Sequence, residues 1–155
     1  MRIYSVKINN RKRAFEVRTA SKLLSFPFSK IELKPSIDDP VRRVVVDKEL
    51  GREAFTFVLD SGKEGTVHVE QVLEYNQDPT YLRDAMLYKL TLEAQSRVEA
   101  SLLSKREIIR RLGTSATQFY RLLDQTNYRK SVGQLLSLLQ ILDCDVEVVV
   151  RAKSA

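Results

Sequence analysis

The spacing of apolar residues changes near residue 78, and this change constrains the fold more than any other feature of the sequence. Before it, apolar residues alternate with polar ones, a pattern typical of half-buried β-strands. After it, they recur every three or four residues, as on one face of an α-helix. The sequence therefore predicts an α+β protein, with a small antiparallel β domain over residues 1–77 and a helical domain over residues 78–155.

Residues 1–77 predict five or six short strands, arranged in one small antiparallel sheet or an open barrel. The strands are expected at residues 4–8, 15–17, 24–28, 44–46, 55–59 and 67–69. Asn9 and Asn10 predict the first hairpin turn, because asparagine tolerates positive φ angles. Pro27 places the third strand at a sheet edge, since proline cannot donate a hydrogen bond to a neighbouring strand.

The helical half begins with a clear start signal. Asp78 suits an N-cap, and Pro79 suits the first helical position, where its missing N–H is not needed. A helix of about 20 residues is expected to follow. Its buried stripe is predicted at Leu82, Met86, Leu90 and Ala94, with Leu87 and Val98 beside it.

Three further start signals lie between residues 103 and 142. Each is a serine followed three positions later by glutamate or glutamine, the capping box in which both side chains satisfy backbone N–H groups. The pairs are Ser104 with Glu107, Ser115 with Gln118, and Ser131 with Gln134. They predict two short helices and a leucine-rich helix, followed by a C-terminal strand over residues 146–150.

Only Gly113 and Thr114 separate the first short helix from the serine that caps the second. Two helices joined this tightly cross at a steep angle, as in a helix-turn-helix. Residues 103–115 resemble the opening helix and turn of the Cro/C1-type, or XRE, helix-turn-helix family, and the likeness covers about residues 80–145. The residues that stand where this family has equivalent ones are Gly113, Ile108, Leu112, Phe119 and Leu122.

The resemblance implies a lambda-repressor-like helical domain in a sequence-specific DNA-binding regulator of transcription from a prokaryote. Antitoxins and phage-type regulators of this family are often of this size, and the size and layout of the chain suggest the antitoxin of a toxin–antitoxin pair. The implied partners are double-stranded DNA and, on the β domain, a toxin; sensing a small molecule or shaping a dimer are the other roles open to that domain. The alternative is a protein-interaction module whose helix-turn-helix no longer binds DNA, and salt-dependent retention on duplex DNA distinguishes the two.

The helix after the turn carries the residues expected to read DNA. If Phe119, Leu122 and Leu123 face inward, steps of 100° per residue place Arg121 outward. Arginine can bind O6 and N7 of guanine together, and glutamine can pair with adenine. We predict DNA contacts from Lys105, Ser115, Thr117, Gln118, Tyr120, Arg121, Arg129 and Lys130.

The remaining predicted contacts are to phosphate. Lys105 lies at a helix start, where backbone N–H groups also favour phosphate. Arg129 and Lys130 lie on the following loop, where contacts to the DNA backbone position a protein without reading sequence. Asp124 is expected to lie off the DNA path or to orient Arg121. Alternatively, Arg121 and Asp124 form a surface ion pair three residues apart.

Basic residues cluster where these contacts are expected. The chain carries a net charge of +6, and residues 97–130 hold eight basic and three acidic side chains, a net charge of +5. Such a cluster is the electrostatic footprint of a protein that binds nucleic-acid phosphates. The alternative is that these side chains form only a solvated helix face.

Composition limits the other classes of function. Cys144 and His68 are the only cysteine and histidine, which excludes an internal disulfide and a histidine-based metal triad. His68 is expected on the outer face of its strand. No catalytic constellation is found, so we expect no catalytic residues, no metal, no cofactor and no enzyme activity. No segment reaches the roughly 18 apolar residues of a membrane span, and charge interrupts the N-terminus before a signal-peptide core, so a cytoplasmic protein without a membrane partner is expected.

A homodimer is the expected assembly, because helix-turn-helix modules usually read two half-sites about one DNA turn apart. The last helix carries more apolar residues than its own core needs, among them Leu136 and Ile141. The strand over residues 146–150 has an unpaired edge, which invites a partner. Alternatively, Leu136 and Ile141 pack on the N-terminal sheet of the same chain, and the terminal strand joins that sheet.

Overall fold

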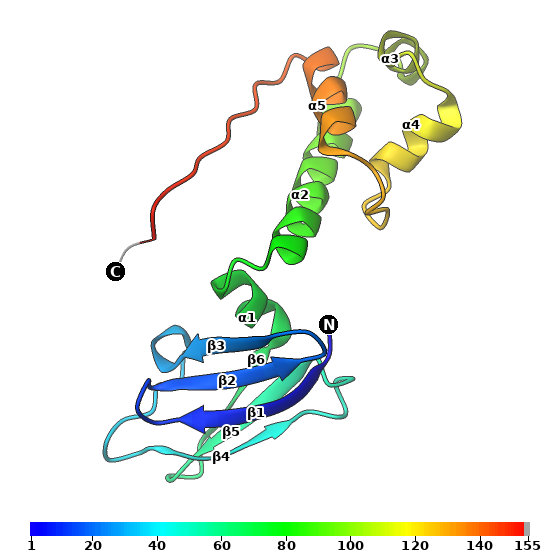
Figure 1. Cartoon of the computed structure of the whole chain (residues 1–155). Coiled ribbons are helices and arrows are strands. Elements are labelled where there is room, and N and C mark those ends of the chain that lie inside the picture. The colour runs from blue at the N-terminus through cyan, green and yellow to red at the C-terminus, as the bar shows by residue number, and fades with distance from the viewer. Residues whose placement is uncertain (154–155) are drawn as a thin grey trace. The chain divides into compact units, whose positions relative to one another are not determined.

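The computed structural model describes residues 1–153 and has an α+β architecture. The described residues form two three-stranded antiparallel sheets and five α-helices (Figure 1). The chain divides into two compact units. Their boundary in the sequence lies between Leu82 and Arg83, slightly after the boundary predicted at residue 77. We call them the β unit and the helical unit. Among the described helices, none combines the length and apolar content that a membrane span requires.

The β unit contains two three-stranded sheets, so the prediction of one small sheet is wrong, whereas the alternative of an open barrel stays a prediction. Strands β1 (Ile3–Asn9), β2 (Ala14–Thr19) and β3 (Leu23–Pro27) form one, and β4 (Val41–Val46), β5 (Ala54–Leu59) and β6 (Glu64–His68) form the other. Strands β1 and β4 lie close together but are not hydrogen-bonded as neighbours. At the start of β1, the Arg52 guanidinium donates to the carbonyl oxygens of Ile3 at 3.1 Å and Tyr4 at 2.7 Å.

Aromatic side chains from both sheets meet in one core. The ring of Phe15 on β2 lies 4.9 Å from the ring of Phe55 and 5.4 Å from that of Phe57, both on β5. It also lies 4.9 Å from Phe28, which begins a single turn of 3-10 helix (Phe28–Lys30) where the sequence predicts strand. All four rings are buried, so apolar burial holds the two sheets face to face.

Helix α1 (Val69–Tyr75) replaces the end of the sixth predicted strand. His68 is its N-cap: the Nδ1 atom accepts a hydrogen bond from the Glu70 N–H at 3.3 Å, and the Gln71 side chain accepts one from the His68 N–H at 2.9 Å. Val69 is therefore helical and buried. The alternation of Val67 and Val69 extends the strand prediction too far because histidine is not among the usual capping residues.

Helix α2 (Pro79–Ala100) begins where predicted, but its buried stripe differs from the prediction. The Asp78 carboxylate accepts a hydrogen bond from the Tyr81 N–H at 3.0 Å, which confirms the N-cap. The buried residues are Leu87, Thr91, Ala94 and Val98, whereas Met86 is 53% exposed. Thr91 can be buried because its hydroxyl donates to the carbonyl oxygen of Leu87 at 2.5 Å.

Helices α3 (Lys105–Leu112), α4 (Ala116–Leu123) and α5 (Val132–Ile141) confirm the three predicted helix starts. The hydroxyls of Ser104, Ser115 and Ser131 each accept a hydrogen bond from the N–H three residues later, at 3.1 Å. Only the box of Ser131 and Gln134 is reciprocal. At Ser104 the prediction is wrong in this detail, because the Glu107 carboxylate binds two arginines of its own helix instead.

The predicted strand over residues 146–150 is absent from the described structure. The chain continues from α5 as an extended segment without a sheet partner (Figure 1). Ile141 packs against the core of the helical unit, and Leu136 is 39% exposed. A strand requires a hydrogen-bonded neighbour, and neither sheet of the β unit includes this segment.

We predict that Asp78→Ala destabilises the β unit. The Asp78 side chain is buried, caps α2 and forms an ion pair with Lys22. Losing the cap and the pair should lower the free energy of unfolding by about 1–3 kcal/mol, measured by urea denaturation at neutral pH. Asp38→Ala, which removes an exposed carboxylate, is the control, and an equal effect of the two substitutions contradicts the prediction.

The contribution of Asp78 should also depend on pH. Its hydrogen bonds with Lys22 and with the Tyr81 N–H lower the pKa of the carboxyl from 3.8. A group with a lowered folded-state pKa stabilises the protein above its unfolded pKa, and this stability is lost as the pH falls through the folded pKa. The difference between wild type and Asp78→Ala should therefore shrink below about pH 4.

Candidate nucleic-acid interface

The turn between α3 and α4 is fixed by backbone geometry. Gly113 ends α3 in the left-handed conformation, with φ of 71° and ψ of 33°. Its N–H donates to the carbonyl oxygen of Ile109 at 3.1 Å, and the Thr114 N–H donates to the same oxygen at 3.4 Å. Ser115 then caps α4. Two eight-residue helices are thus joined with only two residues between the end of one and the cap of the next.

Apolar contacts decide which side of α4 faces outward. Phe119 and Leu122 are buried in the core of the helical unit, together with Ile108 of α3 and Leu135 and Leu138 of α5. This confirms the inward positions predicted for Phe119 and Leu122, and Leu123 packs partly against the same core. The exposed residues of α4 include Thr117, Gln118, Tyr120 and Arg121. These side chains are available to a ligand that approaches α4 from solvent.

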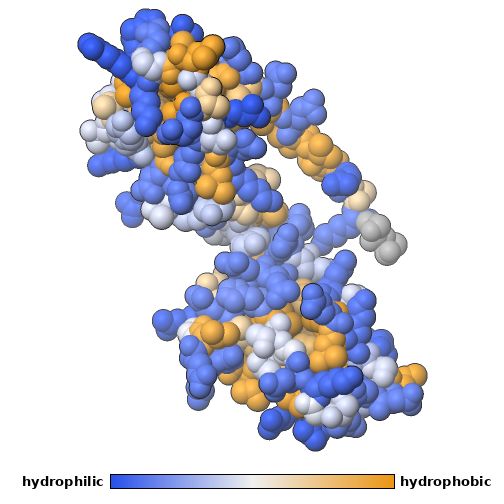
Figure 2. All heavy atoms as spheres, turned by 180° about the vertical axis from the view of Figure 1, so that it is seen from behind, coloured by the Kyte–Doolittle hydropathy of each residue, from blue (hydrophilic) through white to orange (hydrophobic). Residues whose placement is uncertain are grey.

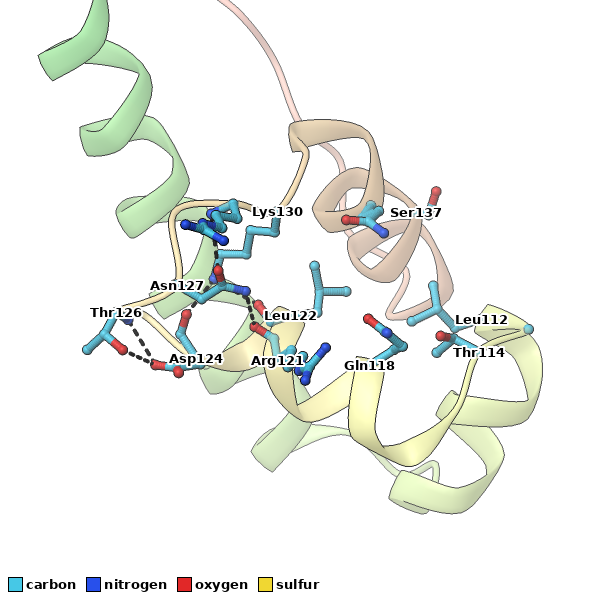
Figure 3. A pocket seen from close by; sticks show the side chains of 13 residues that line it. Leu112, Thr114, Gln118, Arg121, Leu122, Asp124, Thr126, Asn127, Lys130 and Ser137 are labelled. Atoms are coloured by element: carbon cyan, nitrogen blue, oxygen red, sulfur yellow. Dashed lines mark hydrogen bonds between the residues drawn. The ribbon is translucent and has the colours of Figure 1, made fainter.

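A polar hollow of about 880 Å³ lies beside α4 (Figure 3). It is lined by the end of α3, by α4, by the loop after α4 and by α5. Three predicted contact residues with exposed side chains, Gln118, Arg121 and Arg129, belong to this lining. The structure adds polar residues that the sequence analysis missed: Thr114, Thr126, Asn127, Gln134 and Ser137.

Four of the other predicted contact residues do not line the hollow. Lys105 is the first residue of α3, and its ammonium nitrogen lies 3.6 Å from a Glu99 carboxylate oxygen. The Ser115 hydroxyl is engaged as the cap of α4. Thr117 and Tyr120 are exposed on α4, and the Tyr120 ring packs edge-on against Phe119 at 5.4 Å. The predicted residues therefore form two sets, one around the hollow and one on the flanking surfaces.

Arg121 and Arg129 carry the unpaired charge of the hollow. Within residues 1–153, neither guanidinium makes a hydrogen bond or an ion pair. The alternative pairing of Arg121 with Asp124 is wrong for this structure, because Asp124 instead accepts hydrogen bonds from the Thr126 hydroxyl at 2.7 Å and N–H at 2.9 Å. These bonds lower the pKa of the Asp124 carboxyl from 3.8. Asp124 therefore shapes the loop and does not orient Arg121.

The structure argues against the predicted DNA contact of Lys130. Its side chain is buried, and its ammonium donates to the carbonyl oxygens of Leu122 at 2.9 Å and Asp124 at 2.7 Å (Figure 3). Burial lowers the pKa of this ammonium from 10.5. Because its hydrogen-bonding capacity faces the protein, Lys130 closes the C-terminal end of α4 and is not available to a DNA phosphate.

Two further side chains complete the end of α4. The Asn127 amide donates to the carbonyl oxygen of Arg121 at 3.1 Å, and the Gln95 amide of α2 donates to that of Leu123 at 2.7 Å. Together with Lys130, they bind three consecutive carbonyl groups at the end of α4, where few intrahelical donors remain. The Arg121 carbonyl also accepts a hydrogen bond from the Asp124 N–H at 3.3 Å. The position of α4 is thus fixed by α2, by the loop and by the apolar core.

Much of the positive charge of residues 97–130 is paired with acidic side chains of the same chain. Glu107 binds Arg110 at 2.5 Å and Arg111 at 3.0 Å, which neutralises much of the charge on the second half of α3. Hydrogen bonds from these two arginines lower the pKa of the Glu107 carboxyl from 4.5 to about 2. Three basic side chains of residues 97–130 have no hydrogen-bond or ion-pair partner in the described structure. They are Arg106, Arg121 and Arg129. Two of the three lie at the hollow.

We predict that Lys130→Met destabilises the helical unit, whereas Arg129→Met does not. The lysine substitution leaves two carbonyl groups without their buried donor and should cost about 1–3 kcal/mol of unfolding free energy. Arg129 is exposed and its guanidinium has no partner among the described residues, so its replacement should change stability by less than about 0.5 kcal/mol. Thermal unfolding followed by far-UV circular dichroism measures both. Equal effects of these two neighbouring substitutions would show that the internal role of Lys130 is wrong.

No protein family, curated protein or solved structure matches this chain. Within the described residues, no cluster of histidine, cysteine, aspartate and glutamate is arranged to hold a metal ion. The functional interpretation therefore depends on the geometry and charge of the helical unit itself.

Proposed function

We propose that the helical unit binds double-stranded DNA with α4 as its recognition helix, and that the chain regulates transcription by sequence-specific binding. One observation carries the proposal. The guanidinium groups of Arg121 and Arg129 lack partners in the described chain, and they line one hollow together with the amide of Gln118. Unpaired guanidinium and amide groups on the exposed side of a tightly held helix are suited to base edges and phosphates.

In this proposal, the position of each side chain determines which part of the DNA it contacts. An α-helix with its side chains is about 10–12 Å wide and fits the major groove of DNA, which is about 12 Å wide. Arg121, on α4 itself, would bind O6 and N7 of a guanine, and Gln118, one turn earlier, would pair with adenine. Arg129, on the loop, would bind a backbone phosphate and fix the register without reading sequence. Thr117 and Tyr120 would contact the neighbouring groove walls.

The order of the helices supports a lambda-repressor-like arrangement within this proposal. A long helix, a short helix, a tight glycine turn, a second short helix, a loop and a leucine-rich helix follow one another from α2 to α5. This order and the capped turn agree with the XRE resemblance. The presence of a separate β unit supports the further suggestion of an antitoxin, in which that unit would bind a toxin.

We predict that Arg121→Ala and Arg129→Ala weaken DNA binding in different ways. Removing a bidentate base contact should cost about 1–3 kcal/mol on preferred sequences and relax specificity at one base position. Removing a phosphate contact should weaken binding to all sequences alike and reduce the salt slope by about one. Duplexes selected from a random pool, followed by fluorescence anisotropy over a range of salt concentrations, measure both effects.

Lys7→Ala provides the control, because it removes one exposed positive charge from the β unit and should leave binding nearly unchanged. Glu107→Gln is a second comparison, because it releases Arg110 and Arg111 and adds one unit of net charge. Absence of duplex binding at about 50 mM salt would contradict the proposal, since electrostatic binding is strong at low salt. That result would favour the protein-interaction module instead.

A further inference from the structure

Three charged side chains form one hydrogen-bonded cluster on α3. The Glu107 carboxylate accepts hydrogen bonds from Nε of Arg110 at 2.9 Å, from Nη2 of Arg110 at 2.5 Å and from Nε of Arg111 at 3.0 Å. The two arginines follow Glu107 by three and four residues, which places all three side chains on one face of the helix. The side chains of Arg110 and Arg111 are 71% and 48% exposed, and that of Glu107 is 32% exposed. One partly covered carboxylate therefore holds two guanidinium groups that are open to solvent.

The other ion pairs within residues 83–130 are looser. Each joins one basic and one acidic side chain at a distance beyond that of a hydrogen bond. They are Arg83 with Asp84 at 3.7 Å, Arg97 with Glu93 at 3.7 Å, and Lys105 with Glu99 at 3.6 Å. Exposed pairs of this kind have little fixed geometry. Among the ion pairs within residues 83–130, only those of the Glu107 cluster are thus held by hydrogen bonds.

Arg110 and Arg111 lie close to the hollow in the sequence but do not line it. The lining begins at the end of α3 with Leu112 and Gly113 and includes neither arginine. Figure 2 shows hydrophilic residues spread over the face of the helical unit that it presents, between apolar areas. A polyanion can therefore meet polar surface of this unit in more than one orientation. Guanidinium groups that do not reach base edges bind phosphates, which are the same in every sequence.

We propose that Glu107 determines specificity in DNA binding: it holds Arg110 and Arg111 and so weakens binding to sequences that α4 does not read. This role rests on DNA binding through α4, the proposed function. On the preferred sequence, base contacts from α4 fix the orientation, so a released arginine gains a phosphate only where one lies within its reach. On other sequences no base contact fixes the orientation, and each released guanidinium can find a phosphate. Releasing the arginines would therefore strengthen binding to non-preferred DNA most.

A purely structural role for Glu107 is the alternative. Its carboxylate lies in the first turn of α3, where the helix dipole favours negative charge, and its N–H donates to the Ser104 hydroxyl at 3.1 Å. Glutamine keeps this N–H and the size of the side chain, and exposed ion pairs contribute little to stability. We therefore expect Glu107→Gln to fold. A structural role predicts no change in the ratio of affinities for preferred and other DNA.

Glu107→Gln in the full chain tests this role with two duplexes of equal length, one selected from a random pool and one with a scrambled sequence. Fluorescence anisotropy over a range of salt concentrations gives their dissociation constants. At about 100 mM salt, the substitution should tighten binding to the scrambled duplex by about tenfold and steepen its salt slope by about one to two, because phosphate contacts are added. Binding to the selected duplex should tighten by less than about threefold, so the ratio of the two affinities should fall by about threefold or more.

Glu93→Gln is the matched control. It adds the same unit of charge to the helical unit, but it releases only Arg97, from a pair at 3.7 Å. The ratio of affinities for the selected and scrambled duplexes should stay nearly unchanged.

Removing the two arginines completes the test. Arg110→Gln combined with Arg111→Gln should weaken binding to the scrambled duplex by about fivefold more in the Glu107→Gln background than in the wild type, because only there do both guanidinium groups lack a partner. A change in stability common to both backgrounds cancels in this comparison.

Three results would overturn the role of Glu107 and leave DNA binding through α4 standing. They are an equal gain for both duplexes in Glu107→Gln, an equal effect of Glu93→Gln, and an effect of the arginine substitutions that does not depend on the background. Absence of duplex binding by the wild-type chain at about 50 mM salt would overturn both proposals.

Discussion

The position of α4 depends on hydrogen bonds to its last three carbonyl groups. With eight residues, the helix is too short to be stable in isolation. Asn127, Lys130 and Gln95 bind the carbonyl oxygens of Arg121, Leu122 and Leu123 in turn. Ser115 satisfies the other end, and burial of Phe119 anchors the helix to the core. Hydrogen bonds at both ends and apolar burial on one side therefore fix the position of α4. Its exposed face can be polar without loss of the fold.

This arrangement explains why adjacent basic residues have different roles. Lys130 donates inward to two backbone carbonyls, while the guanidinium of Arg129 faces the hollow with no partner in the described chain. Arg110 and Arg111 are likewise held by Glu107. At the hollow, the positive charge available to a ligand is thus that of Arg121 and Arg129. A polyanion that approached the helical unit would meet these two groups beside the exposed face of α4.

Local signals predicted the helices, because a cap or a glycine turn is encoded within a few residues. Ser104, Gly113, Ser115 and Ser131 each act where predicted. The features that depend on distant partners could not be predicted. The division of the strands into two sheets is one such feature, and the contact of Arg52 with the start of β1, nearly 50 residues away, is another. Lys130 is buried, unlike Arg129, because it binds carbonyl groups six and eight residues away. The strand predicted at residues 146–150 needs a neighbouring strand that the described chain does not provide.

An NMR titration of the intact chain would show whether α4 and the adjoining hollow bind duplex DNA, as proposed. Amide and side-chain resonances would be followed while a short duplex is added at low salt. We predict shifts concentrated in α4 and the loop after it, with the guanidinium signals of Arg121 and Arg129 among the largest, and little change in the β unit. Shifts confined to the β unit, or no shifts in α4 at saturating duplex, would contradict the account.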